Sequence, residues 1–219
     1  MKRACAHAAF EMIKDGMTIG LGGGSTVAFL IEELEQSGKR ITAVTPSGDT
    51  KELCLTHHIP IQNLEDTAHV DLAFDGCDEL DYNLNALKSC GGIHVREKIM
   101  ASMADQYILL ADEEKYKETL QFHYPVTIEV IKAARTVVKK NLMHLGAEVK
   151  ERHSDQKAGL LISDDGNYLM EAYFTNVKDS KSLSDTLDQM AGIAGHSLFC
   201  AIAKKAIVAK KEKIDIIER

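Results

Sequence analysis

The chain has 219 residues, of which 45% are hydrophobic, and its formal net charge at pH 7 is -7. This length allows one large or two small domains with a real hydrophobic core. The negative charge and the lack of a long basic run argue against nucleic acid as a partner, because binding to a phosphate backbone needs clustered Lys and Arg.

The first half of the chain alternates apolar strand-like runs with helical patterns, which is typical of an α/β domain with a mostly parallel sheet. We expect a helix over 2–14, stopped by Asp15-Gly16, then a strand over 17–21 and, beyond a glycine loop, a helix over 25–36. Further strands are expected over 41–44, 70–74 and 107–110, and further helices over 51–56 and 95–104.

The pattern changes near Pro125, where a strand and a helix over 131–145 are followed by strands over 148–152, 160–163 and 168–174. A helix over 182–190 and an apolar run over 198–203 complete the pattern. The segment 164–167, Asp-Asp-Gly-Asn, indicates a hairpin turn. We therefore predict a Rossmann-like domain of residues 1–123 plus 197–219, with a mostly parallel sheet, and a smaller inserted α+β domain of residues 124–196.

The basic stretch 204–213 alternates lysines with Ala, Ile and Val. This alternation predicts a partly buried edge with solvated lysines rather than a functional tail.

The first segment that carries chemistry is the glycine loop Gly22-Gly23-Gly24-Ser25-Thr26. It follows a strand and opens a helix, so its backbone amides, its two hydroxyls and the helix N-terminus together favour a bound phosphate. It lacks both the Gly-Lys-Ser/Thr ending of a nucleotide P-loop and the spacing of a dinucleotide motif. The alternative is a tight turn in which Ser25 only caps the helix.

The second segment is Asp75-Gly76-Cys77-Asp78-Glu79, placed at the end of an apolar strand. In open parallel sheets ligands bind beyond the carboxyl ends of the strands, so these acids and the glycine loop are expected to line one crevice. A calcium or magnesium loop is a competing interpretation, but the segment lacks the alternation and closing glutamate of an EF-hand. Helix capping by Asp75 or Asp78 is a further alternative.

The third segment runs from Lys88 through Ser89, Cys90 and Gly91 to Glu97. The glycines of this segment expose backbone amides that could stabilise a developing oxyanion, Lys88 offers a cation, and Glu97 offers a carboxylate whose basicity would rise in a dry site. Alternatively, Glu97 is an ordinary polar residue of its helix. Three such segments in one predicted crevice favour proton-transfer chemistry on a small polar ligand.

The apolar runs are too short to span a membrane, and the N-terminus lacks the features of a signal peptide, which predicts a cytoplasmic protein with no membrane partner. The cysteines are scattered and odd in number, without a C-x-x-C pair, so neither a disulfide framework nor a zinc site is predicted. They are expected to be reduced: Cys5, Cys54, Cys77, Cys90 and Cys200.

Taken in order, the motifs GGGST, DGCDELD, KSCGG, REKI and LLADEEK resemble the ribose-5-phosphate isomerase A family over nearly the whole chain. The family's Asp-Gly-x-Asp-Glu block is intact. Its phosphate loop and its Lys-Gly-Gly-Gly loop are altered, since Gly23 stands for a threonine and Ser89-Cys90 stand for two glycines. The loop 45–50 also replaces a serine-rich segment.

The resemblance implies an aldose-ketose isomerase that interconverts ribose 5-phosphate and ribulose 5-phosphate through a cis-enediol, in the non-oxidative pentose phosphate pathway. It implies no metal, no organic cofactor, and a homodimer or higher homo-oligomer. Glu97 would be the base, and Asp75, Asp78 and Lys88 would open the sugar ring and position its oxygens. The implied substrate-binding residues are Gly23, Gly24, Ser25 and Thr26 for the phosphate, and Ser89, Cys90, Gly91 and Lys115.

Alternatives remain open at this point. One alternative is an isomerase of a different phosphorylated sugar. The altered loops could change the sugar specificity, because side chains at 89 and 90 restrict the backbone conformations that glycines would allow. A phosphosugar-binding sensor would keep the phosphate loop without a working base, although the chain has no room for a DNA-binding motif before Met17. A glucosamine-6-phosphate deaminase would need a histidine-centred site, and His94 is expected to be a loop residue instead.

Overall fold

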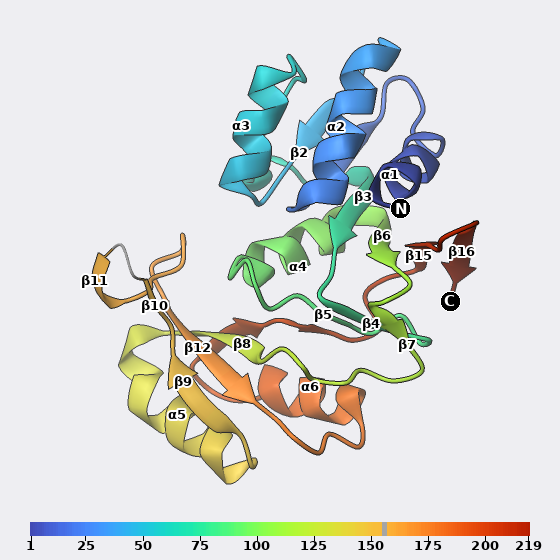
Figure 1. The fold of residues 1–219 in the computed structure, drawn as a ribbon. Helices are drawn as coiled ribbons and strands as arrows, with labels where there is room; N and C mark the ends of the chain where they lie inside the picture. The colour runs from blue at the N-terminus through green and yellow to red at the C-terminus, as the bar shows by residue number, and fades with distance from the viewer. Residues whose placement is uncertain (155–156) are drawn as a thin grey trace.

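The larger part of the molecule is a twisted sheet covered by helices on both faces (Figure 1). The computed structural model describes residues 1–154 and 157–219. Within these residues the sheet has the strand order β16-β15-β6-β3-β1-β2. Its elements are α1 (Lys2–Phe10), β1 (Thr18–Leu21), α2 (Ser25–Ser37), β2 (Thr42–Val44), α3 (Gly48–Thr56), β3 (Val70–Gly76), α4 (His94–Met103), β6 (Ala104–Asp112), β15 (Lys205–Ala209) and β16 (Ile214–Glu218).

Side chains that alternate along β3 and β6 pack against helices on the two faces of the sheet. Phe74 and Ile108 pack in one core with α1, α2 and α3, whereas Ala73 and Leu109 pack in another with Met100 of α4. Successive residues of a strand point to opposite faces, so continuously apolar strands can bury both sides of a parallel sheet. The predicted α/β, mostly parallel fold is confirmed.

The strand order creates a crevice next to β1. From β1 the chain passes through α2 to β2 on one side, while β3 pairs with β1 on the other, and all these pairings are parallel. The carboxyl ends of β1 and β3 therefore flank a topological switch point, where ligands of open α/β sheets bind.

A second sheet has the order β13-β8-β12-β9. Val138 and Leu142 of one helix and Leu187 of another pack on the same face of it. Because residues 126–196 supply this sheet and both helices, we propose that 124–196 form a small domain. Its elements are β8 (Val126–Val130), α5 (Arg135–His144), β9 (Glu148–Glu151), β10 (His153–Ser154), β11 (Lys157–Leu160), β12 (Tyr168–Tyr173), α6 (Ser180–Asp188) and β13 (Ile193–His196).

A third sheet, in the order β14-β5-β4-β7, was not anticipated from the sequence. It joins a β4–β5 hairpin to strands that come from distant parts of the chain, and pairings this short leave no hydrophobic period in the sequence. Its strands are β4 (Glu79–Asp81), β5 (Ala86–Leu87), β7 (Tyr116–Lys117) and β14 (Leu198–Phe199).

Several predicted boundaries were wrong. The first helix ends at Phe10, because the backbone then enters turns in which the amides of Met12 and Ile13 donate three residues back. The helix expected over 131–145 starts at Arg135, after the 3-10 turn Lys132–Ala134. The strand expected over 160–163 lies earlier, at Lys157–Leu160, and only an isolated bridge follows it at Ile162.

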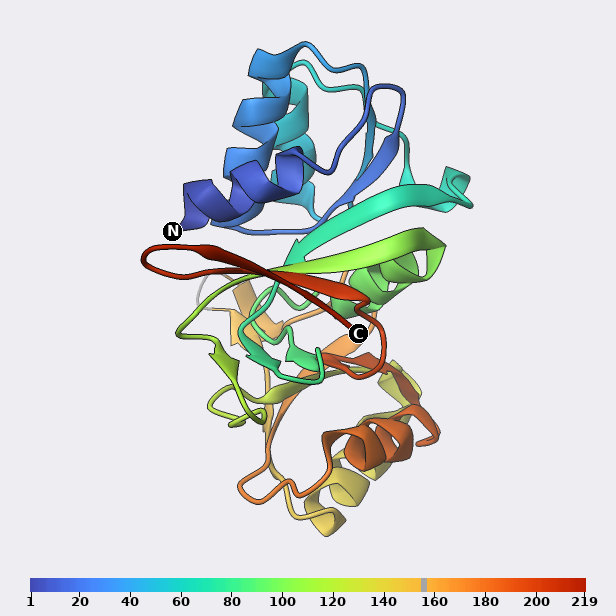
Figure 2. The same ribbon diagram turned by 90° about the vertical axis from the view of Figure 1, so that its right-hand side faces the viewer.

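The C-terminal prediction also needs correction. In the apolar run 198–203 only Leu198 and Phe199 pair as a strand. The basic stretch 204–213 contains β15, which is an inner strand buried between β6 and β16, so the sheet edge is β16 instead. The β15–β16 hairpin packs against α1, and its turn lies beside the N-terminus, whereas the C-terminus lies at the other end of the hairpin (Figure 2).

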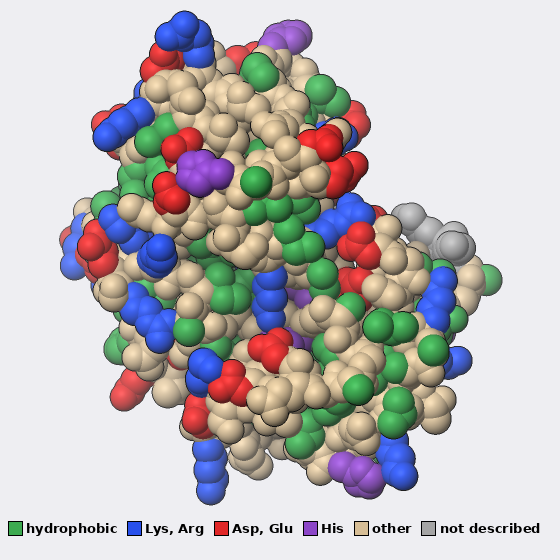
Figure 3. Space-filling view, turned by 180° about the vertical axis from the view of Figure 1, so that it is seen from behind, with side chains coloured by type: hydrophobic (Ala, Val, Ile, Leu, Met, Phe, Trp, Pro, Cys, Tyr) green, Lys and Arg blue, Asp and Glu red, His purple; other side chains and the backbone are tan. Residues whose placement is uncertain are grey.

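None of the described helices has the length and apolar character needed to span a bilayer. On the face seen in Figure 3, acidic and basic side chains are interspersed, and the coloured residues form no extended basic patch there.

Candidate active site

A cleft of about 570 Å³ opens at the carboxyl ends of the parallel strands. Most of the predicted site residues line it: Gly23, Gly24, Ser25, Thr26, Asp78, Lys88, Cys90, Gly91, Glu97 and Lys115. Two do not. Asp75 lies behind Lys88 with 1% of its surface exposed, and Ser89 is equally buried.

The glycine loop lies where β1 ends and α2 begins. Gly24, with a φ of 102°, is the N-cap residue of α2, and no side chain forms a capping hydrogen bond there. Ser25 is therefore the first residue of the helix, and the alternative that it merely caps α2 is wrong. Its hydroxyl and the exposed amides of the helix N-terminus face the cleft, where they suit an anion.

Gly22, just before this loop, explains how the loop and the acidic segment fit together. A Cβ atom on Gly22 would lie 1.9 Å from Oδ1 of Asp75, which is far inside van der Waals contact. The backbone amide of Gly22 donates to the carbonyl of Phe74 at 2.9 Å. The absence of a side chain at position 22 thus lets the Asp75 carboxylate pack directly against β1.

Lys2, which was not anticipated from the sequence, also lines the cleft. Its ammonium group donates to Ser25 Oγ at 2.8 Å, so a cation from α1 reaches the glycine loop. Ser47, Gly48 and Asp49 line the same end of the cleft. A lysine near a chain end carries no local signal, because its neighbour is set by the packing of α1 against α2.

Lys88 joins two carboxylates in the floor of the cleft. Its Nζ lies 2.9 Å from Asp75 Oδ1 and 3.2 Å from Glu97 Oε1, and these three side chains are 6%, 1% and 7% exposed, respectively. The ammonium group also donates to the carbonyl of Gly76 at 2.6 Å. Tyr107, which the sequence analysis missed, donates its hydroxyl to Asp75 Oδ2 at 2.9 Å.

The electrostatics of this cluster favour a base of moderate strength. Burial and, to a smaller extent, the nearby Asp75 raise the pKa of Glu97 to about 8, against the opposing effect of Lys88. Burial disfavours the charge of Lys88, but Asp75 and Glu97 outweigh it and hold the pKa of Lys88 above its ordinary range. Within the cluster one ammonium group faces two carboxylates, so Glu97 can accept and release a proton near neutral pH.

Asp78 shapes the loop that follows Lys88. Its Oδ2 accepts the backbone amides of Ser89 at 2.6 Å and Cys90 at 3.1 Å. These two amides are therefore not free to stabilise an oxyanion, because Asp78 already accepts from both. Ser89 also turns its hydroxyl away from the cleft, toward the carbonyl of Pro125.

The other acids of the DGCDELD segment point elsewhere. Glu79 accepts backbone amides from residues 121–124, and Asp81 accepts those of Asn83 and Asn85. Their divergence does not fit a calcium or magnesium loop. Among the described residues, the group of three carboxylate and imidazole side chains close enough to share a cation is His69, Asp71 and Asp105, which lie near the amino ends of β3 and β6, away from the cleft.

The remaining candidates are the cysteines, Lys115 and His94. All five cysteines are free. Burial raises the pKa of Cys77 to about 12 and that of Cys90 to about 11, so neither is a ready nucleophile. Lys115 donates to the carbonyl of Cys77 at 2.7 Å at the edge of the cleft.

His94 is the first residue of α4, not a loop residue as expected, and it is fully buried. Burial lowers its pKa to about 3. Among the described residues that line the cleft, none is a histidine, which argues against a histidine-centred deaminase site.

Comparison with known proteins shows the family to which this chain is similar. The family model described as ribose 5-phosphate isomerase A (phosphoriboisomerase A) matches residues 42–213. A ribose-5-phosphate isomerase A from Prochlorococcus marinus (strain MIT 9211) is 35% identical, over 96% of this chain and 91% of its own length.

Two solved structures are also similar. The ribose 5-phosphate isomerase A of Methanocaldococcus jannaschii superposes with a TM-score of 0.92 at 32% identity, covering 100% of this chain and 98% of that one. A D-ribose-5-phosphate isomerase in complex with phospho-erythronic acid superposes with a TM-score of 0.93 at 35% identity, covering 100% and 97%. Both alignments include the whole of the cleft described above.

Proposed function

The chain belongs to the ribose-5-phosphate isomerase A family, and we propose that its cleft interconverts ribose 5-phosphate and ribulose 5-phosphate with Glu97 as the base. The observation that carries the proposal is the buried Asp75–Lys88–Glu97 cluster in the same cleft as the glycine loop. An aldose-ketose isomerase needs a carboxylate base, an electrophile at the carbonyl oxygen and a grip on the phosphate. This cleft has a candidate for each.

Phosphate binding falls to the glycine loop. Gly23, Gly24, Ser25 and Thr26 offer amides, hydroxyls and the N-terminus of α2, while Lys2 adds a positive charge from α1. The phosphate holds the far end of the sugar and leaves the first two carbons to reach the floor of the cleft. Lys115 and Gly91 would contact the sugar along its length.

Ring opening comes first, because the furanose has no free carbonyl. A proton must leave the hydroxyl on C1 and another must reach the ring oxygen. Lys88, whose ammonium group is already hydrogen bonded and charged, would supply the donor there, and Asp78 in the lining of the cleft would supply an acceptor. Asp75 would act from behind, by holding Lys88 in place.

Glu97 then removes the proton from C2 of the open-chain aldehyde. The electron pair of the C2–H bond forms the C1=C2 bond of the cis-enediol, and the carbonyl electrons move to O1, whose negative charge Lys88 stabilises. Glu97 returns the proton to C1, while the proton of the C2 hydroxyl is transferred to O1 and the carbonyl forms at C2. Atoms and electrons balance without an oxidant or a reductant.

The test is ketose formation from ribose 5-phosphate by the purified protein in the presence of a chelator. Glu97→Gln preserves shape and removes the base, so turnover should fall by about 10²- to 10⁴-fold. Glu148→Gln, the same change at an exposed glutamate of β9, is the control and should keep the wild-type rate. Clear binding of ribose 5-phosphate without wild-type turnover would refute the proposal and favour a phosphosugar sensor or a different substrate.

Assembly and location belong to the same proposal. We infer a homodimer or a higher homo-oligomer from the family resemblance, and light scattering tests this. A cytoplasmic location is supported by the five free cysteines, which suit a reducing compartment, and cell fractionation tests it.

A further inference from the structure

The loop Ser89–Cys90 departs from the glycines of the family pattern, yet it links Lys88 to the helix that carries Glu97. Its geometry therefore decides whether the cation and the base meet. Glycines in such a loop tolerate many conformations, whereas residues with side chains must be held in one. The structure shows what holds them.

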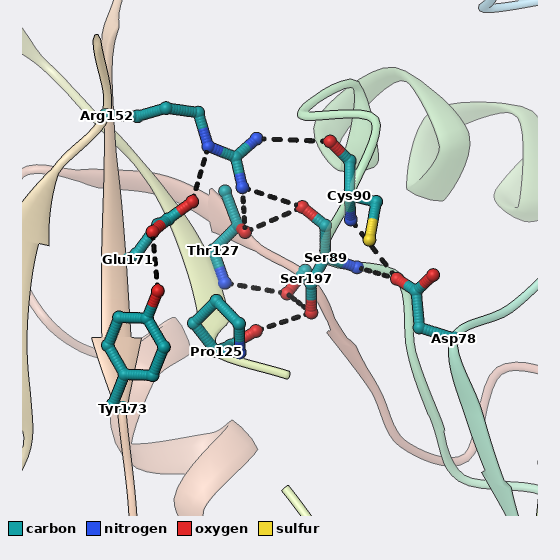
Figure 4. A network of polar contacts seen from close by, with 9 residues as sticks. All are labelled: Asp78, Ser89, Cys90, Pro125, Thr127, Arg152, Glu171, Tyr173 and Ser197. Carbon is teal, nitrogen blue, oxygen red and sulfur yellow. Dashed lines mark hydrogen bonds and ion pairs between the residues drawn. The ribbon is translucent and has the colours of Figure 1, made fainter. Parts of the chain in front are cut away.

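The backbone amides and carbonyls of Ser89 and Cys90 are all hydrogen bonded, the amides to one residue and the carbonyls to another (Figure 4). On one side, Asp78 accepts the amides of Ser89 and Cys90. On the other, Arg152 donates from Nη2 to the carbonyl of Ser89 at 2.9 Å and from Nη1 to the carbonyl of Cys90 at 3.3 Å. Asp78 lies in the larger domain, whereas Arg152 follows β9 of the small domain.

Arg152 is itself fixed on the face of the small sheet opposite α5 and α6. Its Nε donates to Glu171 Oε1 at 2.9 Å, and Tyr173 donates to the other oxygen of Glu171 at 2.8 Å. Thr127 Oγ1 accepts from Nη2 at 3.0 Å and donates to the carbonyl of Ser89 at 2.8 Å. Arg152 and Glu171 are mostly buried, with 14% and 23% of their side chains exposed.

The guanidinium group also packs closely against the loop. A Cβ atom on Gly92 would lie 3.0 Å from Nη1 of Arg152, and Gly92 has a φ of 71°. Ser89 adds a contact that glycine could not make, because its hydroxyl donates to the carbonyl of Pro125 at the start of β8. The loop is thus fastened to the small domain by backbone and side chain together.

We propose that Arg152 is a positioning residue for the isomerisation: the small domain uses its guanidinium fork to set the Ser89–Cys90 loop, and through it the meeting of Lys88 with Glu97. This inference rests on the proposed function. Arginine suits the task because its planar fork bonds two carbonyls and a carboxylate at once, which a lysine cannot do.

The test compares Arg152→Gln with Arg135→Gln. Arg135 lies on the same small domain and pairs with Glu151, and among the described residues it makes no hydrogen bond to the loop, so its replacement removes the same charge without removing a loop contact. A misplacement of about 1 Å in reacting groups costs about 10²-fold in rate. We therefore expect Arg152→Gln to lower kcat by about 10- to 100-fold with KM changed by less than about threefold, and Arg135→Gln to change neither.

Two further measurements separate positioning from simple loss of stability. Arg152→Lys should recover little of kcat although it keeps the charge, and free guanidinium ion at millimolar concentration should restore part of the turnover of Arg152→Ala without raising its melting temperature. A kcat of Arg152→Gln equal to that of Arg135→Gln would overturn the inference. So would a loss explained entirely by a smaller folded fraction.

Should Arg152→Gln fail to fold, Glu171→Gln carries the test, since it leaves Arg152 in place but removes its charged acceptor. Lower kcat at unchanged KM is then expected, and an unchanged kcat overturns the inference. Wild-type protein without isomerase activity would instead refute the proposed function, so the two failures are distinguishable.

Discussion

Replacing Glu97 by glutamine should make the protein more stable as it makes it inactive. Glu97 is almost fully buried, and it shares Lys88 with Asp75. Burial and the neighbouring Asp75 disfavour the negative charge of Glu97, and its pKa therefore rises from 4.5 to about 8. A glutamine side chain at this position would keep the shape and remove the charge, leaving a neutral Asp75–Lys88 pair in the floor of the cleft.

The magnitude follows from linkage between protonation and folding. In the folded chain Glu97 holds its proton up to about pH 8, whereas in the unfolded chain it loses the proton near pH 4.5. Between these values the folded state binds more protons, so the free energy of unfolding of the wild type falls as pH rises. The full rise in pKa corresponds to at most about 5 kcal/mol.

We therefore expect Glu97→Gln to gain stability relative to the wild type progressively from pH 4.5 to 8, reaching about 1–5 kcal/mol at pH 8. In a chain of this size each kcal/mol raises the melting temperature by about 2–4 °C. Urea unfolding of both proteins at pH 5, 6, 7 and 8 measures the difference. Below pH 4.5 the carboxyl is protonated in both states, and the difference should no longer change.

The matched control is Glu148→Gln, at an exposed glutamate that pairs with Lys150 on β9. Its stability should follow that of the wild type over the whole pH range. If the difference between Glu97→Gln and the wild type is constant from pH 5 to 8, Glu97 does not titrate near pH 8 and the account of the base is refuted.

Three further outcomes are expected. Asp75→Asn removes a negative charge that raises the pKa of Glu97, so the rise of kcat/KM with pH should have its midpoint at lower pH than in the wild type, measured at subsaturating substrate. Gly22→Ala would force a Cβ against Asp75 and should destabilise the fold by about 1–3 kcal/mol in urea unfolding. Lys2→Met removes the cation that contacts the glycine loop, the proposed phosphate site, and should raise KM about tenfold with little change in kcat.

The changes at Gly22 and Lys2 each have a control within the chain. Gly48→Ala meets no atom within 4 Å and should leave stability unchanged, so equal losses at 22 and 48 would contradict the steric account. Arg3→Met removes a neighbouring exposed cation that pairs with Glu32, and a KM raised as much as by Lys2→Met would point to a general effect of charge. A midpoint that moves upward in Asp75→Asn would contradict repulsion between the carboxylates.

The elements that could be predicted were those with a local signal. Apolar periodicity identified β1, α2, β3 and β6, and the glycine and aspartate positions after β1 and β3 predicted where the ligand crevice lies. Boundaries failed where turns replaced regular hydrogen bonding, as after Phe10. The third sheet was missed because each of its short strands is defined by its partner and not by its own sequence.

What the sequence by itself determined was the α/β class, the family resemblance and the set of acids, lysines and glycines available for chemistry. Tertiary structure alone decided how they are used: Lys88 meets both Asp75 and Glu97, Tyr107 donates to Asp75, and Asp78 accepts the amides of the Ser89–Cys90 loop. Arg152 reaches Ser89 across 63 residues of sequence. Such contacts depend on strand register and on the packing of one domain against the other, and neither leaves a mark in the spacing of residues along the chain.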